Sequence, residues 1–208
     1  MNRSGKRLFI LKYERRAANE RFICTSFSPK LNNMKNVIIR YGLISGGIAA
    51  LLMICTALYY HNASDWSGGE IIGYAGILLS LVFVFLGVRA YREQRAGQAF
   101  GFGKAFQVGL LITLISCALY VVAWMLVYEI LMPDFMEKYA DHMLASLRAS
   151  GASEAVIQQQ TAKMAEYKAM YQNPFVRIAL TFIEPFPMGL LVTVISALIL
   201  KRPAPSAA

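Results

Sequence analysis

Four long blocks of apolar residues limit what this chain can fold into more than any other feature. They cover residues 37–60, 71–88, 106–132 and 175–200. Each is long enough for a helix to cross a bilayer, which takes roughly 20 residues. Buried helices of a soluble protein would need a polar face at helical period, and these blocks have none. The sequence therefore predicts an all-α membrane protein with four transmembrane helices.

Composition and charge support this prediction. Of the 208 residues, 57% are hydrophobic and 16% are charged, whereas soluble domains carry about 25% charged residues. Only four charged residues fall inside the blocks: Arg40, Glu129, Arg177 and Glu184. Most of the net charge of +9 is therefore carried by the segments between and around the blocks.

The positions of Lys and Arg predict how the helices are oriented. Ten basic residues precede or open the first block, and further ones follow the second and fourth blocks. The connection 61–70 has no Lys or Arg, and the connection 133–174 has four against five acidic residues. Because short cytoplasmic segments are enriched in Lys and Arg, both termini are expected in the cytoplasm. The basic N-terminus lacks interleaved aromatic residues, so no nucleic-acid partner is expected.

The first 33 residues differ from the rest of the chain. They carry eight basic residues and no apolar stripe of useful length, whereas Met34 opens a segment that leads directly into the first block. We therefore expect a transmembrane domain over 34–202 and a short tail over 203–208. Residues 1–33 are expected to be disordered or a wrongly assigned start, with translation beginning at Met34. The alternative is a basic arm that binds anionic lipid.

Residues 134–172, between the third and fourth blocks, predict a two-helix hairpin outside the membrane. Ser150 and Gly151 can end a first helix, and Ser153 with Glu154 can begin a second. Apolar side chains recur at helical spacing in both halves. These faces are expected either to pack on each other or on the membrane surface, or to form a docking surface for a protein partner.

The segment TFIEPFPMGL places Glu184 inside the fourth block, followed by Pro185 and Pro187. Nine residues separate Glu184 from Phe175, which places it about 13 Å into the membrane. A carboxylate there should face the helix bundle or meet a partner. Each proline lacks an N–H donor, so the backbone is expected to kink and to free carbonyl groups one turn earlier.

Two functions are open for this intramembrane polar site. Glu184 can form a structural hydrogen bond to a neighbouring helix, with Thr113, Ser116 or Tyr120 as candidate partners. A carboxylate beside freed carbonyls also resembles the ion sites of transporters with broken helices, which favours a small proton- or cation-linked transporter. We expect a structural or interaction (adaptor or accessory) membrane protein, and the transporter is the alternative. No nucleophile and base pair is present, so no catalytic residue and no enzyme activity are expected.

Gly42 and Gly46 form a small-xxx-small pair suited to close helix packing. Contact within the chain is the first expectation, and a homo-oligomer is the alternative. The three cysteines and two histidines show no metal-ligand spacing. The glycine-rich stretch FGFGKAFQVG lacks the pattern of a phosphate-binding loop. We therefore expect no metal and no cofactor.

Several of these motifs together resemble a known family. FGKAF, PDFMEKY, SGAS and the EPFP of the fourth block look like the bacterial family called domain of unknown function 4199, and the likeness covers Met34 to Arg202. The resemblance implies a multi-pass protein of the bacterial inner (plasma) membrane, with four helices and an outward helical hairpin. It implies no activity.

Overall fold

The computed structural model describes residues 33–61, 68–95 and 98–202. The chain divides into two units, Met1–Val37 and Ile38–Ala208, and the contacts described below lie in the second. Residues 1–32 and the tail 203–208, on which the predictions of an extension and a tail fall, are outside the described residues. Across the described residues the chain is helical and forms no strand.

Among the described residues, four segments are long and apolar enough to cross a membrane. They are the first helix Asn33–His61, the helices α2 (Gly69–Glu93) and α3 (Phe102–Ile130), and the joined pair α6 (Pro174–Ile183) and α7 (Pro185–Leu200). The prediction of an all-helical protein with four apolar spans is thus confirmed. The helices extend beyond some apolar blocks, and α2 continues to Glu93, which pairs with Arg89 one turn earlier.

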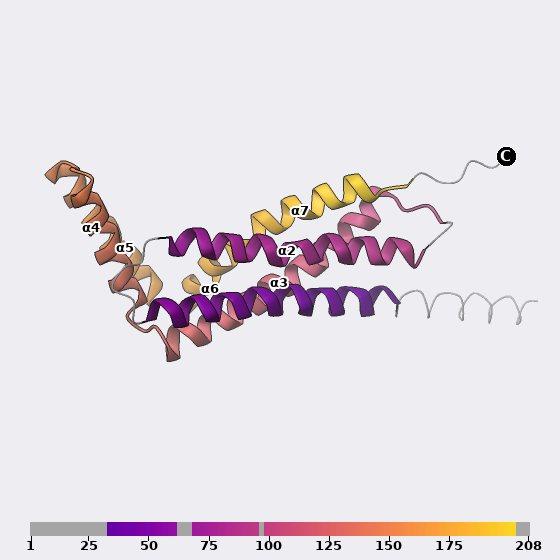
Figure 1. Cartoon of the computed structure of the whole chain (residues 1–208), viewed down its shortest axis with the longest axis horizontal. Coiled ribbons are helices and arrows are strands. Elements are labelled where there is room, and N and C mark those ends of the chain that lie inside the picture. The colour runs from indigo at the N-terminus through magenta and orange to yellow at the C-terminus, as the bar shows by residue number, and fades with distance from the viewer. Residues whose placement is uncertain (1–32, 62–67, 96–97, 203–208) are drawn as a thin grey trace, which may run out of the picture. The chain divides into compact units, whose positions relative to one another are not determined.

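The centre of the bundle is formed by α3, which packs on α7 and α2 (Figure 1). Small residues allow this close approach. A Cβ atom on Gly189 of α7 would lie 2.4 Å from Thr113 Cγ2, and one on Gly109 of α3 would lie 2.9 Å from Thr193 Cγ2. Side chains larger than hydrogen therefore do not fit at these two glycines without movement of a helix.

Buried hydroxyl groups link the same helices. Ser45 Oγ of the first helix lies 3.0 Å from Ser116 Oγ of α3 and donates to the carbonyl of Ser80 of α2 at 2.9 Å. Thr113 Oγ1 lies 3.1 Å from Thr193 Oγ1 of α7. Hydroxyl groups on facing helices stabilise bundles where no water competes for the bond.

Two contacts show which helix ends lie together. Phe100, just before α3, exchanges backbone hydrogen bonds with Arg202 just after α7, at 3.1 and 2.8 Å. Lys138 Nζ donates to the carbonyl of His61, the last residue of the first helix, at 3.2 Å. The segment between α2 and α3 thus meets the end of α7, and the segment after α3 meets the end of the first helix.

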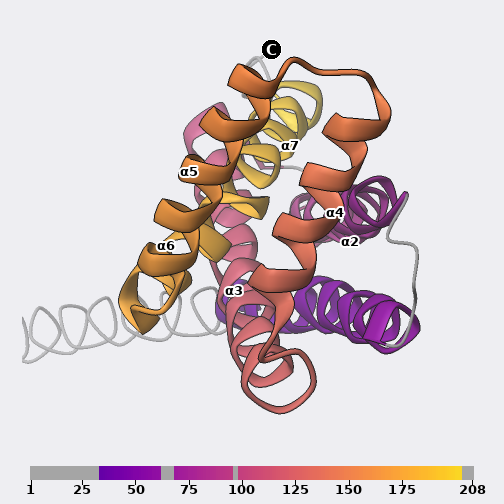
Figure 2. The same cartoon turned by 90° about the vertical axis from the view of Figure 1, so that its left-hand side faces the viewer.

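Two further helices, α4 (Phe135–Ala149) and α5 (Glu154–Tyr171), follow α3 and lie beyond one end of α2 and α3 (Figures 1 and 2). They pack on each other, and Lys168 pairs with Glu137 between them. Gly151 takes a φ of 74° in the connecting turn, a conformation that favours glycine. The helix ends agree with the predicted stop at Ser150 and Gly151 and the predicted start at Glu154.

Candidate functional site

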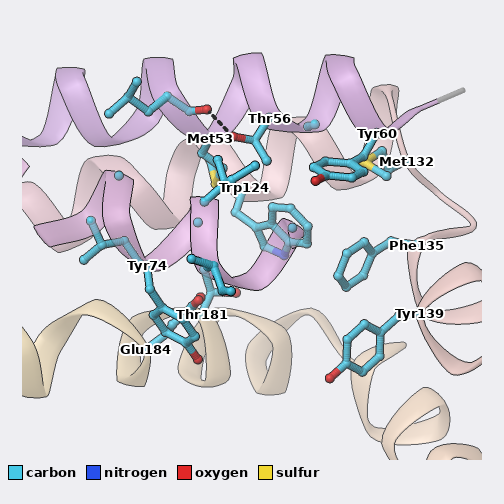
Figure 3. A pocket seen from close by; sticks show the side chains of 18 of the residues that line it. Met53, Thr56, Tyr60, Tyr74, Trp124, Met132, Phe135, Tyr139, Thr181 and Glu184 are labelled. Atoms are coloured by element: carbon cyan, nitrogen blue, oxygen red, sulfur yellow. Dashed lines mark hydrogen bonds between the residues drawn. The ribbon is translucent and has the colours of Figure 1, made fainter. Parts of the chain in front are cut away.

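A cavity of about 900 Å³ lies under α4, at the end of the bundle that α4 and α5 overlie. Its walls come from the first helix, α2, α3, α4 and α6, with Tyr171 from α5. We call it the chamber (Figure 3). Its volume falls in the range of small-molecule sites, about 300–1,000 Å³. The sequence analysis did not predict it, because no single segment contains it.

The chamber wall is mostly apolar and aromatic. The aromatic residues that line it are Tyr60, Tyr74, Tyr120, Trp124, Phe135, Tyr139 and Tyr171. Phe135 stands edge-on to Trp124, with ring centroids 4.9 Å apart, and stacks on Tyr139 at 5.9 Å. These contacts fix the rings of α4 against those of α3, so the wall is preformed.

Glu184 lies at the junction of α6 and α7, on the wall of the chamber. Asn173 Oδ1 caps α6 by accepting from the N–H of Phe175 at 2.9 Å, with Pro174 at the first helical position. Helix α6 ends at Ile183, and Pro185 begins α7. The predicted interruption at Glu184 is therefore present, although Glu184 itself keeps right-handed helical angles.

Pro185 and Pro187 both fall in the first turn of α7. The first N–H groups of a helix have no partner within it, so a proline there removes no helical hydrogen bond. Pro185 is buried and Pro187 is exposed. The two prolines thus separate α6 from α7 without disturbing the rest of α7, and they keep Glu184 at the junction.

The carboxylate of Glu184 accepts a hydrogen bond from Tyr120 Oη at 3.3 Å. This distance is long for a hydroxyl donor, whose usual range is about 2.5–3.0 Å. Of the three candidate partners, Tyr120 is the one that meets Glu184, whereas Ser116 bonds Ser45 and Thr113 bonds Thr193. The side chain of Glu184 is also exposed, which leaves acceptor positions open.

A second charged group, Arg177 of α6, lies near the chamber and was not recognised from the sequence. Its side chain is 5% exposed, and its Nη2 donates to Glu129 Oε1 of α3 at 2.5 Å. The guanidinium lies 3.9 Å from the ring centroid of Tyr128 and 5.9 Å from that of Tyr171. A signal was present, because Glu129 and Arg177 are opposite charges near the adjoining ends of two apolar blocks.

Tyr171, at the end of α5, joins this cluster to the chamber. Trp124 Nε1 donates to Tyr171 Oη at 2.6 Å. Burial raises the pKa of the Tyr171 phenol above its ordinary value, so the hydroxyl stays protonated at neutral pH. Trp124, Tyr128 and Tyr171 therefore hold the start of α6 against the end of α3.

The predicted helix-packing pair lies away from the chamber. A Cβ atom on Gly42 would lie 2.8 Å from Ile115 of α3, and one on Gly46 would lie 2.7 Å from Leu119. The structure thus places both glycines of the first helix against α3 of the same chain. Within the described residues, no three His, Cys, Asp or Glu side chains gather as metal ligands would.

Comparison with known protein families identifies a match over most of the chain. A family described as "Protein of unknown function (DUF4199)" matches residues 40–202. No curated protein and no solved structure matches the chain.

Proposed function

Since the chain belongs to the DUF4199 family of unknown function, we propose a function from its own geometry: an accessory membrane protein, not an enzyme, whose chamber receives a membrane-soluble molecule. The observation that carries this proposal is the chamber. About 900 Å³ is bounded by residues of six helices and lined by rings that pack on one another. The interior next to it is filled so closely that glycine is required.

The surroundings of the chamber favour a molecule that arrives through the membrane. Large apolar side chains are exposed along all four apolar segments, among them Leu51, Leu79, Leu126 and Leu191. Such surfaces suit contact with lipid chains. An occupant that dissolves in the bilayer would reach the chamber without crossing a polar barrier.

We place the protein in the bacterial inner membrane, with both termini in the cytoplasm and the α4–α5 pair outside. Support comes from the Lys and Arg distribution and from the contact of α4 with the end of the first helix. A cysteine at the exposed Gln159 should react with an impermeant thiol reagent in cells with a permeabilised outer membrane. Reaction only after the inner membrane is broken would contradict this orientation.

The pair α4–α5 is also our candidate contact for a protein partner. Val156, Tyr167 and Met170 of α5 are exposed, and they include the side-chain types that adapt to partner surfaces. Deletion of 136–172 should abolish co-purification of specific partners while the protein stays in the membrane. A protein that elutes alone, or as a homo-oligomer, from several detergents would remove the support for a separate partner.

The interruption of the fourth span favours a second candidate, a small proton- or cation-linked transporter. A carboxylate between two half-helices is the arrangement that transporters use for coupling ions, and Glu184 stands between α6 and α7. Protein in liposomes should then show flux that Glu184→Gln abolishes. Equal flux in protein-free liposomes would exclude this candidate.

The binding function can be tested with a substitution that fills the chamber. Gly73 of α2 lines it, and a Cβ atom there would meet nothing within 4 Å. Gly47 of the first helix has equal space but lies outside the chamber lining. Native mass spectrometry should detect a retained amphiphile on the parent protein and on Gly47→Phe, but not on Gly73→Phe. Equal retention by both variants would contradict the proposal.

A further inference from the structure

We infer that the chamber is a site for a monovalent organic cation with an apolar tail, such as an alkylammonium, with Glu184 as the counter-ion. This inference rests on the proposed binding function and names the chemical class of the occupant. Charge, aromatic faces and volume each contribute to it.

The charge of the chamber wall is the first step. Among the described residues that line the chamber, Glu184 is the one carboxylate and none is Lys or Arg. His142 of α4 also lines the chamber. Four acidic residues among those described form ion pairs with a basic side chain: Glu93, Glu129, Asp134 and Glu137. Glu184 is not among them. A carboxylate at this depth is costly without a partner, and a cation in the chamber would supply one.

Aromatic residues on the same chamber wall as Glu184 also favour a cation. Tyr74, Tyr120, Trp124 and Tyr171 line the same chamber, and the Tyr120 hydroxyl donates to Glu184. Proteins recognise quaternary ammonium groups with clustered aromatic side chains. The rings of this protein already hold one cation, since the Arg177 guanidinium lies over Tyr128 with Tyr171 nearby.

The apolar part of the chamber wall favours a hydrocarbon tail on the bound molecule. This part of the wall is formed by Leu52 and Met53 of the first helix, Ile72 and Ile77 of α2 and Met143 of α4. These side chains offer no hydrogen bonds to a second polar group. An occupant with one charged end and one hydrocarbon end therefore satisfies both regions, whereas an anion would meet the Glu184 carboxylate with no Lys or Arg among the described lining residues to offset it.

The test compares two probes on the unmodified chain in maltoside micelles. One probe is tetradecyltrimethylammonium, and the other is its neutral isostere, in which carbon replaces the nitrogen. The cation should bind at least about tenfold more tightly, as expected for a desolvated cation beside aromatic rings and a carboxylate. In Glu184→Gln this preference should disappear, and in Glu166→Gln, an exposed residue of α5 outside the chamber, it should persist.

The outcomes of the probe comparison distinguish failure of the cation inference from failure of the binding function. Equal binding of both probes to the parent protein would overturn the cation and leave the binding function standing, and failure of both to bind would overturn both proposals. A preference that survives in Glu184→Gln would show that Glu184 is not the counter-ion. Thermal unfolding of Glu184→Gln is measured alongside, and the probe comparison on the parent protein needs no variant to fold.

Discussion

Two adjacent regions of the helix bundle share α3 and are packed in opposite ways. Around Thr113, Gly189 and Thr193, α3 and α7 approach so closely that a Cβ atom on Gly189 would overlap Thr113. Around Trp124 and Glu184, the same α3 helix and the adjoining α6 border a chamber of about 900 Å³. Small and hydroxylated residues close the first region, and large rings hold the second open. The difference indicates that stability comes from the closely packed region and binding from the open end that holds the chamber.

The largest expected effect is on stability, and it tests the closely packed region around Thr113 and Gly189. Gly189→Ala should lower the free energy of unfolding by about 1–3 kcal/mol, because the added methyl group overpacks the contact with Thr113. Gly73→Ala is the matched change in the chamber wall. It should cost nothing and can stabilise α2 by up to about 1 kcal/mol, since alanine is the better helix former. Thermal unfolding in detergent measures the stability of both variants. Equal losses would remove the contrast between the closely packed region and the chamber wall.

The next effect concerns the rim of the open end. Arg177→Met should destabilise the protein by about 2 kcal/mol, because it removes a charged hydrogen bond to Glu129 and the contact with Tyr128. Arg148→Met on the exposed surface of α4 should change stability by less than about 0.5 kcal/mol. In the Arg177→Met background, Glu129→Gln should add little further loss. A full additional loss would mean that the two residues act independently.

Glu184 should matter less for stability than for binding. Its hydrogen bond to Tyr120 is long and its side chain is exposed, so Glu184→Gln should be nearly neutral. Glu184→Leu should cost about 0.6 kcal/mol, the mean value for such bonds in a membrane bundle. Unfolding of the three forms in one detergent gives the comparison. A loss for Gln as large as that for Gly189→Ala would make Glu184 a structural residue of the core.

The smallest effect lies outside the apolar helices. The hydrogen bond from Lys138 Nζ lowers the pKa of the Asp134 carboxyl. A lowered folded-state pKa contributes stability above the unfolded value of about 3.9, and this is lost as the pH falls through the folded value. The pair is a partly exposed i,i+4 pair, so its contribution is about 0.3–0.5 kcal/mol. Asp134→Asn should make the melting temperature fall less steeply between pH 5 and pH 3. An unchanged slope of melting temperature against pH would contradict this.

The sequence predicted the features that depend on local pattern. Apolar blocks define the spans, Gly151 marks the turn between α4 and α5, and Pro185 marks the interruption beside Glu184. The chamber could not be predicted in this way, because its wall is assembled from helices far apart in the chain. The pairing of Arg177 with Glu129 depends likewise on how α6 meets α3. Only the matching positions of the two charges hinted at it.

The central claim, that the open end receives a molecule, can be tested at Trp124, whose ring lines the chamber. In a Trp66→Phe background, Trp124 is the one tryptophan left of the two in the sequence. Titration with a brominated alkyl amphiphile should quench its fluorescence to saturation, and Gly73→Phe should abolish the saturable part while Gly47→Phe retains it. Quenching that rises without saturation, or equally in both variants, would show that the probe reaches Trp124 only from the surrounding micelle and would contradict a binding chamber.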